Sequence, residues 1–418
     1  QVHNIKRPWV NDTLYCELDN SFKERFGLPN IETWFVSHHY AHSLSGWMLT
    51  EPDVSIIIDG YGNDKTWSIF KNDKLIDSGT PAEGSIGHSM SDVGNYLGIK
   101  SQDILDHAGK VMALQSYGNF NKDYYNHICN YDIRNVNRLF DINEWHRFKD
   151  DDLLGRLTPL DWINTVHYAT GNLLVNFFKK YAKPEDKILY SGGVALNVVW
   201  NTVLKQQFPN LVVLPHSTDE GLSLGGIEFL RRKLGLPKLR IDNFPYCQSD
   251  EYPDKPSNET IKKAAYLLSK GKVVGWYQGN GEIGPRALGN RSILFDPRLT
   301  NGHNIVNRIK RRENYRPFGA SVLAEHANDW FECNWEDPFM LYTTKVKTNT
   351  LPGITHIDGT SRVQTVKDNT VFRSLLEQFY NITGCPVLLN TSLNLAGKPI
   401  AGYKGIAEEL FYITDIDT

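Results

Sequence analysis

Cysteine is scarce in this chain, and the few copies form no pattern. The 418 residues include five cysteines, an odd number with no CxxC pair among them. A disulfide framework or a structural zinc cluster requires paired or closely spaced cysteines. The usage is typical of a reducing compartment, so we expect a cytoplasmic protein without disulfides.

Long apolar runs and an excess of either charge are also missing. No run approaches the roughly 20 apolar residues that cross a bilayer, and the first residues show no signal-peptide pattern, so we expect no membrane contact. A formal net charge of −3 gives no overall positive field for a polyanion. One dense basic stretch, "NRIKRRENYR" (residues 307–316), leaves DNA open as a partner, although the net charge does not indicate it.

Several motifs of common enzyme classes are absent as well. We find no GxGxxG after the first expected strand, no Walker lysine motif, no GxSxG and no defensible pair of glycosidase carboxylates. Dehydrogenase, P-loop nucleotidase and hydrolase functions therefore lose support.

The first half of the chain has the element order of a ribonuclease-H-like unit. Residues 54–79 predict a three-stranded meander, because β-rich runs alternate with turn residues. A helix over 161–181, a buried strand, a helix, a second strand and a helix ending near 235 are expected next. Actin-like folds contain this unit in duplicate. Only about fifty residues precede the meander and the chain opens without Met, "QVHNIKRPWV", so we expect the N-terminal lobe to be incomplete.

Pro, Asp and Ser accumulate and periodicity disappears around residues 238–256, which is typical of a linker. We therefore predict an α/β protein with a first domain over 1–237, this linker, and a mixed α+β domain over 257–418. The second domain begins with a capped amphipathic helix, "SNETIKKAAYLLSKGK".

Three histidines crowd into "SHHYAHSLSGW". If this segment is helical, His38 and His42 share a face, because residues four apart do so. Two imidazoles form half of a site for iron, zinc or a similar divalent ion, which a carboxylate would complete. Asp59 ends a predicted strand and Asp219 opens a predicted helix, so both are candidates. Histidine pairs in a satisfied core or on the surface are the alternative.

His39 points to another side of the same helix, so capping, acid–base and packing roles are all open for it. We keep it as an acid–base candidate for catalysis.

Two glycines join a predicted strand to a helix in "SGGVALN". Free backbone N–H groups at a helix start bind phosphate well, so Gly192, Gly193 and Asn197 are candidates for nucleotide binding. A simple tight turn explains the same pattern.

Arginines recur in rigid, glycine-rich surroundings in the second half. Arg286 and Arg291 lie in "GPRALGNRSILFDPR", and Arg316 and Arg362 lie in turn-like contexts. Guanidinium groups suit bidentate binding of phosphate or carbamoyl groups. A solvated face is the alternative, and it fits "IKRRE" better than Arg286.

Polar side chains gather where a predicted strand ends in "LLNTSLN". Asn390 and Ser392 would line a site there, or they would form an Asx-turn cap.

Together, the chain resembles the O-carbamoyltransferases of the nodulation and antibiotic-biosynthesis type (NodU/CmcH family). The matching strings occur in the family's order: "HHYAH", "IDGYG", "GKVMALQSYG", "SGGVALN", "GPRALGNRSILFDPR", "YRPFGASVL", "IDGTSRVQTV" and "NTSLNLAGKPI". The resemblance implies an actin-like metal domain followed by a YrdC-like domain. The latter makes carbamoyl-adenylate from carbamoyl phosphate and ATP with Mg²⁺, and the former passes the carbamoyl group to a hydroxyl of a small molecule, sugar or nucleoside.

The resemblance also assigns residues. It implies His38, His42, Asp59 and Asp219 as ligands of an iron ion, and it implies carbamoyl phosphate and nucleotide phosphates bound by Arg286, Arg316, Arg362, Asn390 and Ser392, with Arg286 and Arg316 acting in catalysis. The string "STDEG" departs from the family's simpler Gly-Asp pattern, so Glu220 competes with Asp219 as ligand.

Two other functions stay open. One is a nucleic-acid or nucleotide modification enzyme that carbamoylates a hydroxymethyl pyrimidine, or a relative that modifies tRNA. The other is a non-catalytic actin-like protein that binds ATP. A homodimer is also left open.

Overall fold

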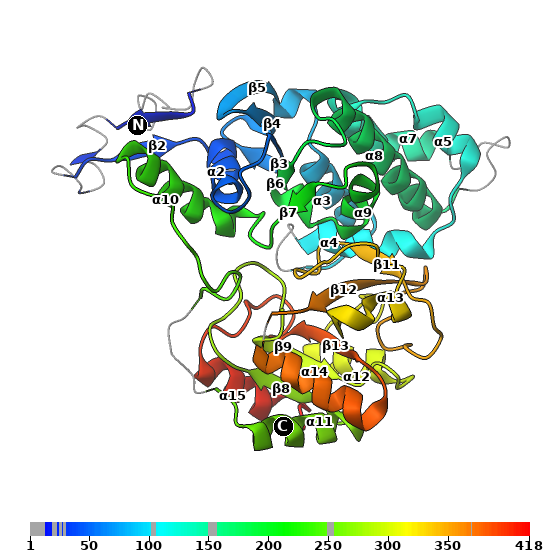
Figure 1. Cartoon of the computed structure of the whole chain (residues 1–418). Coiled ribbons are helices and arrows are strands. Elements are labelled where there is room, and N and C mark those ends of the chain that lie inside the picture. The colour runs from blue at the N-terminus through cyan, green and yellow to red at the C-terminus, as the bar shows by residue number, and fades with distance from the viewer. Residues whose placement is uncertain are drawn as a thin grey trace.

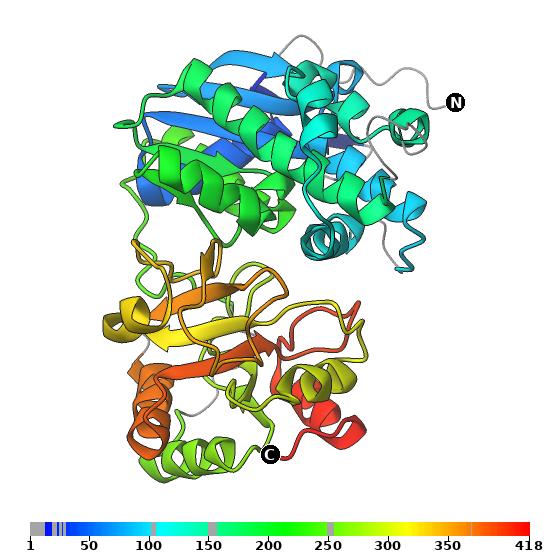
Figure 2. The ribbon, with the colours of Figure 1, turned by 90° about the vertical axis from the view of Figure 1, so that its right-hand side faces the viewer.

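The computed structural model describes residues 13–18, 23–24, 27, 31–101, 106–148, 157–248, 255–368 and 370–418. Their fold is mixed α/β, with two units stacked one above the other (Figures 1 and 2). None of the helices in these ranges is both long enough and apolar enough to cross a membrane.

The first unit is built on a five-stranded sheet with the order β5-β4-β3-β6-β7. β3 pairs antiparallel with β4 and β4 with β5, whereas β3, β6 and β7 run parallel. The predicted meander followed by two parallel strands is therefore confirmed. The strands are β3 (Val54–Gly62), β4 (Lys65–Lys71), β5 (Lys74–Gly79), β6 (Ile188–Ser191) and β7 (Leu211–Val213).

Alternate residues of the central strands face opposite sides of this sheet, as the pleat requires. Ile56 and Ile58 pack into the large core that includes helix α8 (Pro159–Tyr181). Ile57 packs instead with Leu44 of α2 (His38–Thr50) and Phe229 of α10 (Leu222–Lys233). Figure 1 shows α2 and α10 together on that side. The sheet is therefore covered on both faces. Asp59 lies within β3, just beyond the residues Val54 to Ile57 that pair with β6, and not at the strand end that the sequence predicted.

Other helices of the first unit complete the large core. The sequence predicted one helix starting at the glycines of "SGG", where the structure has a 3-10 turn followed by a helix. The pattern between residues 81 and 148 predicted no regular structure. Short helices occupy most of that region, and the bounds of the remaining elements are β1 (Tyr15–Glu17), β2 (Trp34–Val36), η1 (Pro81–Glu83), α3 (Ile86–Tyr96), α4 (Asp106–Leu114), η2 (Gln115–Tyr117), α5 (Lys122–Ile128), η3 (Ile133–Asn135), α6 (Val136–Leu139), α7 (Ile142–Phe148), η4 (Gly193–Leu196), α9 (Val198–Gln207) and η5 (Asp219–Gly221).

The second unit is built on a six-stranded sheet with the order β11-β12-β10-β13-β9-β8. Only the β10–β12 pair is parallel among these strands. Helix α11 begins after the cap Ser257, as predicted, because the Ser257 hydroxyl accepts from the N–H of Thr260. The elements are α11 (Asn258–Ser269), β8 (Val274–Tyr277), β9 (Arg291–Phe295), α12 (Gly302–Lys310), β10 (Gly319–Leu323), η6 (Ala324–His326), α13 (Ala327–Trp330), β11 (Thr343–Lys345), β12 (Thr360–Val366), α14 (Thr370–Thr383), β13 (Val387–Ser392) and α15 (Lys404–Ile413).

The two units are joined by more than the connecting chain. Leu341 and Tyr342 precede β11 but belong to the core of the first unit. The Asn201 side-chain amide on α9 donates to the Leu341 carbonyl at 3.0 Å, and the Thr202 hydroxyl lies 3.1 Å from that of Thr343. Figure 1 shows β11 directly below α9. The second unit is thus docked on α9 by apolar and polar contacts.

Candidate metal centre and anion site

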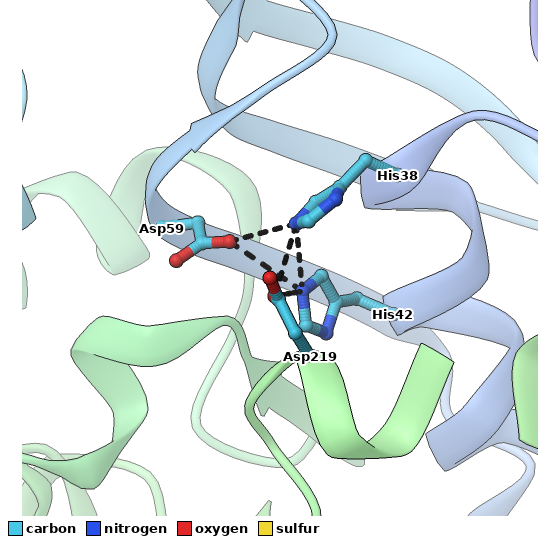
Figure 3. Close-up of side chains that lie close together, drawn as sticks. All are labelled: His38, His42, Asp59 and Asp219. Carbon is cyan, nitrogen blue, oxygen red and sulfur yellow. Dashed lines mark hydrogen bonds and ion pairs between the residues drawn. The ribbon is translucent and has the colours of Figure 1, made fainter. Parts of the chain in front are cut away.

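Four side chains named from the sequence converge beside the central strand β3, just beyond its pairing with β6 (Figure 3). The Nε2 atoms of His38 and His42 lie 3.2 Å apart. His38 Nε2 is 2.9 Å from Asp59 Oδ2 and 3.3 Å from Asp219 Oδ1. One ligand atom from each of the four lies within 4.8 Å of every other. Asp219, and not Glu220, belongs to this set.

Helix periodicity and a glycine at position 62 bring the two histidines into place. α2 begins at His38, so the two imidazoles stand one turn apart on one face. A Cβ on Gly62 would lie 2.3 Å from His38 Cδ2, so the glycine in "IDGYG" makes room for the ring. The Asn63 side chain accepts from the His38 N–H at 2.7 Å and thereby fixes the start of α2.

Backbone N–H groups orient Asp59. Its Oδ1 accepts from Gly60 N at 2.7 Å and from Gly193 N at 3.0 Å, which turns Oδ2 toward the histidines. Gly192 has a φ of 95°, and a Cβ there would lie 2.3 Å from the Ile58 carbonyl oxygen. The predicted phosphate role of Gly192 and Gly193 is therefore corrected: this turn holds a carboxylate of its own chain.

Asn197 also has an internal role in place of nucleotide binding. Its side-chain oxygen accepts from Trp200 N and caps α9, and its amide nitrogen lies 2.9 Å from His167 Nε2. Both the oxygen and the nitrogen of this buried amide are thus hydrogen-bonded within the chain.

The electrostatics of the cluster favour a bound cation. Burial opposes protonation of His38, but hydrogen bonds to Asp219 and Asp59 raise its pKa to about 9. Burial acts against ionisation of Asp59, yet the two histidines hold its pKa well below the usual range. The His38 and His42 hydrogen bonds likewise lower the pKa of Asp219.

Two imidazole nitrogens and two carboxylates fit a divalent transition metal. The two Nε2 atoms face each other, and a cation between the four groups would satisfy both nitrogens and the negative charge of the carboxylates. His38, His42, Asp59 and Asp219 would hold the ion. When bound, it would act as a Lewis acid that polarises an oxygen of the substrate.

Metal affinity is expected to rise with pH. A metal binds only the neutral imidazole, and His38 retains its proton until the pH passes its pKa of about 9. Apparent affinity should therefore increase up to tenfold per pH unit between about 6.5 and 8.5. Calorimetric titration in buffers of different ionisation enthalpy would measure the affinity and the protons released. Affinity independent of pH would contradict protonation of His38.

Replacing Gly193 with alanine is expected to weaken metal binding by about 10- to 100-fold. The added Cβ would lie 2.9 Å from Asp59 Oδ1 and push the carboxylate away from the histidines. Gly226→Ala is the matched control, because a Cβ at this helical glycine meets no atom within 4 Å. Equal metal content in both purified variants, measured by elemental analysis, would refute the orienting role of this turn.

His39, the acid–base candidate, does not join the four side chains. Its Nδ1 lies 2.8 Å from the Ser68 hydroxyl, and the ring borders a cavity of about 10 Å³, the size of one water molecule. Burial lowers the pKa of His39 to about 3. The charge of Asp59 opposes this shift, and the charges of His42 and His38 add to it. The surroundings favour packing over acid–base chemistry.

A second cluster lies in the other unit, where loops and strands bring arginines together. Arg286 lies in the loop after β8, Arg316 between α12 and β10, and Arg362 in β12. Burial lowers the pKa of Arg286 well below its ordinary value, and the charges of Arg362 and Arg316 add to this effect. The three predicted arginines therefore share one electrostatic environment. The buried Nε atoms of Arg286 and Arg362 have no hydrogen-bond partner among the described residues.

Counter-charge in this cluster is weak. Burial raises the pKa of Asp337 to about 7 against hydrogen bonds from three backbone N–H groups, so its negative charge is incomplete near neutrality. Glu313 is the other nearby acid, 4.0 Å from Arg316. Buried cations without sufficient counter-charge cost stability, and an anionic ligand would remove this cost.

The interpretation of "IKRRE" as a solvated face is wrong for two of its residues, Lys310 and Arg312. Lys310 is buried, and its Nζ donates to the Ser392 carbonyl at 2.5 Å and to Asn394 Oδ1 at 2.7 Å. Arg312 Nε donates to Asn307 Oδ1 at 2.5 Å, and its guanidinium lies over the Phe318 ring. Both are cations near Arg316 that the sequence did not single out. The sequence held one signal for this burial: an apolar residue, Ile309, lies between charged residues at the end of a helix.

Arg291, predicted to bind phosphate, has a structural role. It is only 1% exposed, and its guanidinium donates to carbonyl oxygens of Ala401, Gln278, Asn290 and Gly279. It also lies 3.7 Å from the centroid of the Tyr277 ring. These contacts join β8, β9 and the segment after β13, so this arginine is corrected from ligand to core residue.

Arg291→Met is expected to lower the free energy of unfolding by about 3 to 5 kcal/mol, because buried carbonyl groups lose a charged donor. Denaturant unfolding would measure this loss. The exposed Arg308 gives the control variant, Arg308→Met, which should change stability by less than about 0.5 kcal/mol. Equal stability of the two variants would overturn the structural assignment.

Asn390 lies beside the segments that carry Arg286 and Arg362, whereas Ser392 lies beside Lys310. In register, Gly319 of β10 pairs with Arg362 on one side and Asn390 on the other. Asn390 Nδ2 donates to the Ser321 hydroxyl at 2.9 Å and to the Ala287 carbonyl at 3.3 Å, which steadies the loop that carries Arg286. The Ser392 hydroxyl donates to Asn394 Oδ1 at 2.6 Å. Asn390 Oδ1 has no partner among the described residues.

Comparison with known proteins decides the family. The family model described as the carbamoyltransferase N-terminus matches residues 28–227, and the one described as the carbamoyltransferase C-terminus matches residues 265–418. The chain belongs to the carbamoyltransferase family. The two matches fall on the units that carry the metal-ligand cluster and the arginine cluster, respectively.

Relatives of the chain include a nodulation protein and an O-carbamoyltransferase. Nodulation protein NolNO of Sinorhizobium fredii is 31% identical over 92% of this chain and 62% of its own length. The 3'-hydroxymethylcephem-O-carbamoyltransferase of Amycolatopsis lactamdurans is 38% identical over 51% of this chain and 44% of its own. Matches to these relatives thus span about half to three-fifths of their length.

One solved structure is also similar. The activator of 2-hydroxyisocaproyl-CoA dehydratase from Clostridium difficile, with bound ADPNP, is 12% identical to the chain. It aligns with a TM-score of 0.31 over 49% of this chain and 70% of its own. A score this low supports no conclusion about the present fold.

Proposed function

We propose that the chain is an ATP-dependent O-carbamoyltransferase with two reaction sites, one in each unit. The buried arginine cluster with weak counter-charge carries this proposal, because it suits two phosphate-bearing substrates, carbamoyl phosphate and ATP with Mg²⁺. Family membership supports carbamoyl transfer as the reaction class. A YrdC-like character of the second unit and an actin-like character of the first are part of the proposal.

In the second unit, water would release phosphate from carbamoyl phosphate, leaving carbamate. A carbamate oxygen would then attack the α-phosphorus of ATP, and pyrophosphate would leave, giving carbamoyl-adenylate. Arg286, Arg316 and Arg362 would offset the charge that develops on the phosphates. Asn390 would hold the Arg286 loop, and Lys310 would hold the end of β13 against α12.

In the first unit, a hydroxyl oxygen of the acceptor would attack the carbamoyl carbon, AMP would leave, and the hydroxyl proton would pass to solvent or to a base. His38, His42, Asp59 and Asp219 would hold iron or a related divalent ion beside the reacting group. Because the Asp59 carboxylate is fixed by two backbone N–H groups, the ligand set is preorganised. Transfer between the units inside the protein would limit hydrolysis of the adenylate.

One experiment tests the proposal directly. The protein is incubated with ATP, Mg²⁺, isotopically labelled carbamoyl phosphate and a panel of hydroxylated acceptors that includes hydroxymethyl-pyrimidine nucleotides and DNA. Pyrophosphate release that requires carbamoyl phosphate, together with label on one acceptor, is expected. Absence of both pyrophosphate and AMP with every acceptor would reject the reaction, and a non-catalytic ATP-binding protein would then be the better proposal.

DNA as a long acceptor has little support from the basic stretch "NRIKRRENYR". Arg308 and Arg311 are exposed in it, but Lys310 is buried and Arg312 lies over Phe318. Small hydroxylated molecules and nucleotides are therefore the first acceptors to test.

A further inference from the structure

A short segment of the first unit reaches two of the three arginine-bearing segments of the second, those of Arg316 and Arg362. This segment, residues 106–117, consists of α4 and η2, and we call it the strap. It includes most of the string "GKVMALQSYG", which the functions assigned above do not use. In Figure 1 α4 lies at the lower edge of the first unit, above the second unit. The strap is thus placed to connect the two candidate sites.

The strap's first contact is an ion pair between the two units, in which the lysine is buried and the carboxylate is partly exposed. Lys110 is 5% exposed, and its Nζ donates to Glu313 Oε1 at 2.7 Å and to the Lys100 carbonyl at 2.8 Å. Although burial opposes ionisation of Glu313, the bond from Lys110 keeps its pKa below the ordinary value. A hydrogen bond between two charged groups is stronger than one between neutral groups.

Glu313 in turn belongs to the loop that carries Arg312 and Arg316. It follows Arg312 directly, and its carbonyl accepts from Arg316 N at 3.2 Å. Its other carboxylate oxygen lies 4.0 Å from the Arg316 guanidinium. Glu313 is therefore held by Lys110 on one side and faces Arg316 on the other.

The strap's second contact reaches the turn before Arg362. The Ser116 hydroxyl donates to Asp358 Oδ2 at 2.9 Å, and His356 Nε2 lies 3.1 Å from the Ala113 carbonyl oxygen. Asp358 Oδ1 accepts from Thr360 N at 3.0 Å, at the first residue of β12. The same strap thus contacts the chain on both sides of the arginine cluster.

On its other side the strap packs on α3, which starts beside the metal-ligand cluster. A Cβ on Gly94 would lie 2.4 Å from His107 Cβ, and a Cβ on Gly87 would lie 2.7 Å from Gly60 Cα. The Ser85 hydroxyl donates to the Gly60 carbonyl at 2.7 Å, next to Asp59. Close packing therefore runs without interruption from one candidate site to the strap.

We propose that Lys110 is a positioning residue for the anion site of the other unit. Through Glu313 it fixes the loop of Arg312 and Arg316, so that the first unit completes the site where carbamoyl phosphate and ATP would bind. This inference rests on the function proposed above and adds that the adenylate-forming site depends on docking of the two units. Lys110 itself need not touch substrate.

The test uses the full chain and four variants: Lys110→Met, Lys110→Arg, Glu313→Gln and the double variant Lys110→Met with Glu313→Gln. Pyrophosphate binding is measured by calorimetry, and the KM for carbamoyl phosphate and kcat by pyrophosphate release. Lys110→Met should raise both the dissociation constant for pyrophosphate and the KM by about tenfold, with kcat within about threefold of the unaltered chain. Lys110→Arg, which keeps the charge, should restore most of the loss.

Two controls separate positioning from general damage. Lys100→Met removes an exposed lysine but leaves the carbonyl that Lys110 uses, so it should bind pyrophosphate normally. The double variant should be no weaker than either single variant, because the two residues act through one contact. If Lys110→Met does not fold, Glu313→Gln alone must show the same increase in KM.

An unchanged pyrophosphate dissociation constant in folded Lys110→Met or Glu313→Gln would overturn the inference, as would additive losses in the double variant. The proposed function fails separately, when the unaltered chain binds pyrophosphate but releases none from ATP in the presence of carbamoyl phosphate. In that case the binding measurements still decide the role of Lys110.

Discussion

Arg286→Met is expected to abolish pyrophosphate release while leaving the protein as stable as before or more so. Arg286 is buried among Arg362 and Arg316, and its Nε has no hydrogen-bond partner among the described residues. Removing a buried cation from like charges relieves repulsion, which we expect to add about 1 kcal/mol to the free energy of unfolding. Losing a fixed guanidinium from a phosphoryl site should lower the rate by about 10³-fold or more.

Arg291→Met is the matched control, because it makes the same substitution five positions away in the same motif. Its guanidinium donates to backbone carbonyls, so its loss should reduce stability first and activity only through unfolding. Thermal melts and pyrophosphate release are measured for both variants under identical conditions. If Arg286→Met is the less stable of the two and keeps its activity, the two roles have been exchanged.

The opposite behaviour of these two arginines marks the limit of sequence reasoning. "GPRALGNRS" contains two arginines in rigid surroundings. The string does not indicate which of them is bonded within the core and which is left for a ligand. Arg291 begins β9, where cross-strand pairing with Tyr277 directs it inward. Lys310 shows the same limit, because a lysine at a helix end normally reaches water, and only the packing of α12 against the end of β13 buries it.

The four candidate metal ligands were easier to predict from the sequence than the roles of these arginines, for a physical reason. The His38 and His42 pair depends on helix periodicity alone, and the carboxylates are predicted at the end of a strand and the start of a helix. The roles of Gly62 and Gly193 could not be foreseen, because they depend on a histidine and an aspartate distant in sequence. Likewise, the meander was predictable from local pattern, whereas the short helices from α3 to α7 depend on tertiary packing for their stability.

His42→Ala is expected to lose the metal and stop transfer to any acceptor, with pyrophosphate release retained. His42 is fully buried, with its Nε2 at 3.5 Å from Asp59 Oδ2 and 3.4 Å from Asp219 Oδ1, so no neighbouring side chain can replace it. Removing one of four ligands should reduce carbamoylated product by about 10³-fold. Because adenylate formation is assigned to the other unit, pyrophosphate release should stay within about threefold of the original rate.

His39→Ala provides the comparison, since it removes a buried histidine from the same turn of α2. His39 Nδ1 lies 2.8 Å from the Ser68 hydroxyl, and His39 is not one of the four candidate ligands, so this variant should melt at a lower temperature yet keep its metal. Elemental analysis, pyrophosphate release and mass spectrometry of the acceptor are applied to both variants. Simultaneous loss of pyrophosphate release and transfer in folded His42→Ala would show that the two reactions share one site, and would contradict the division between the units.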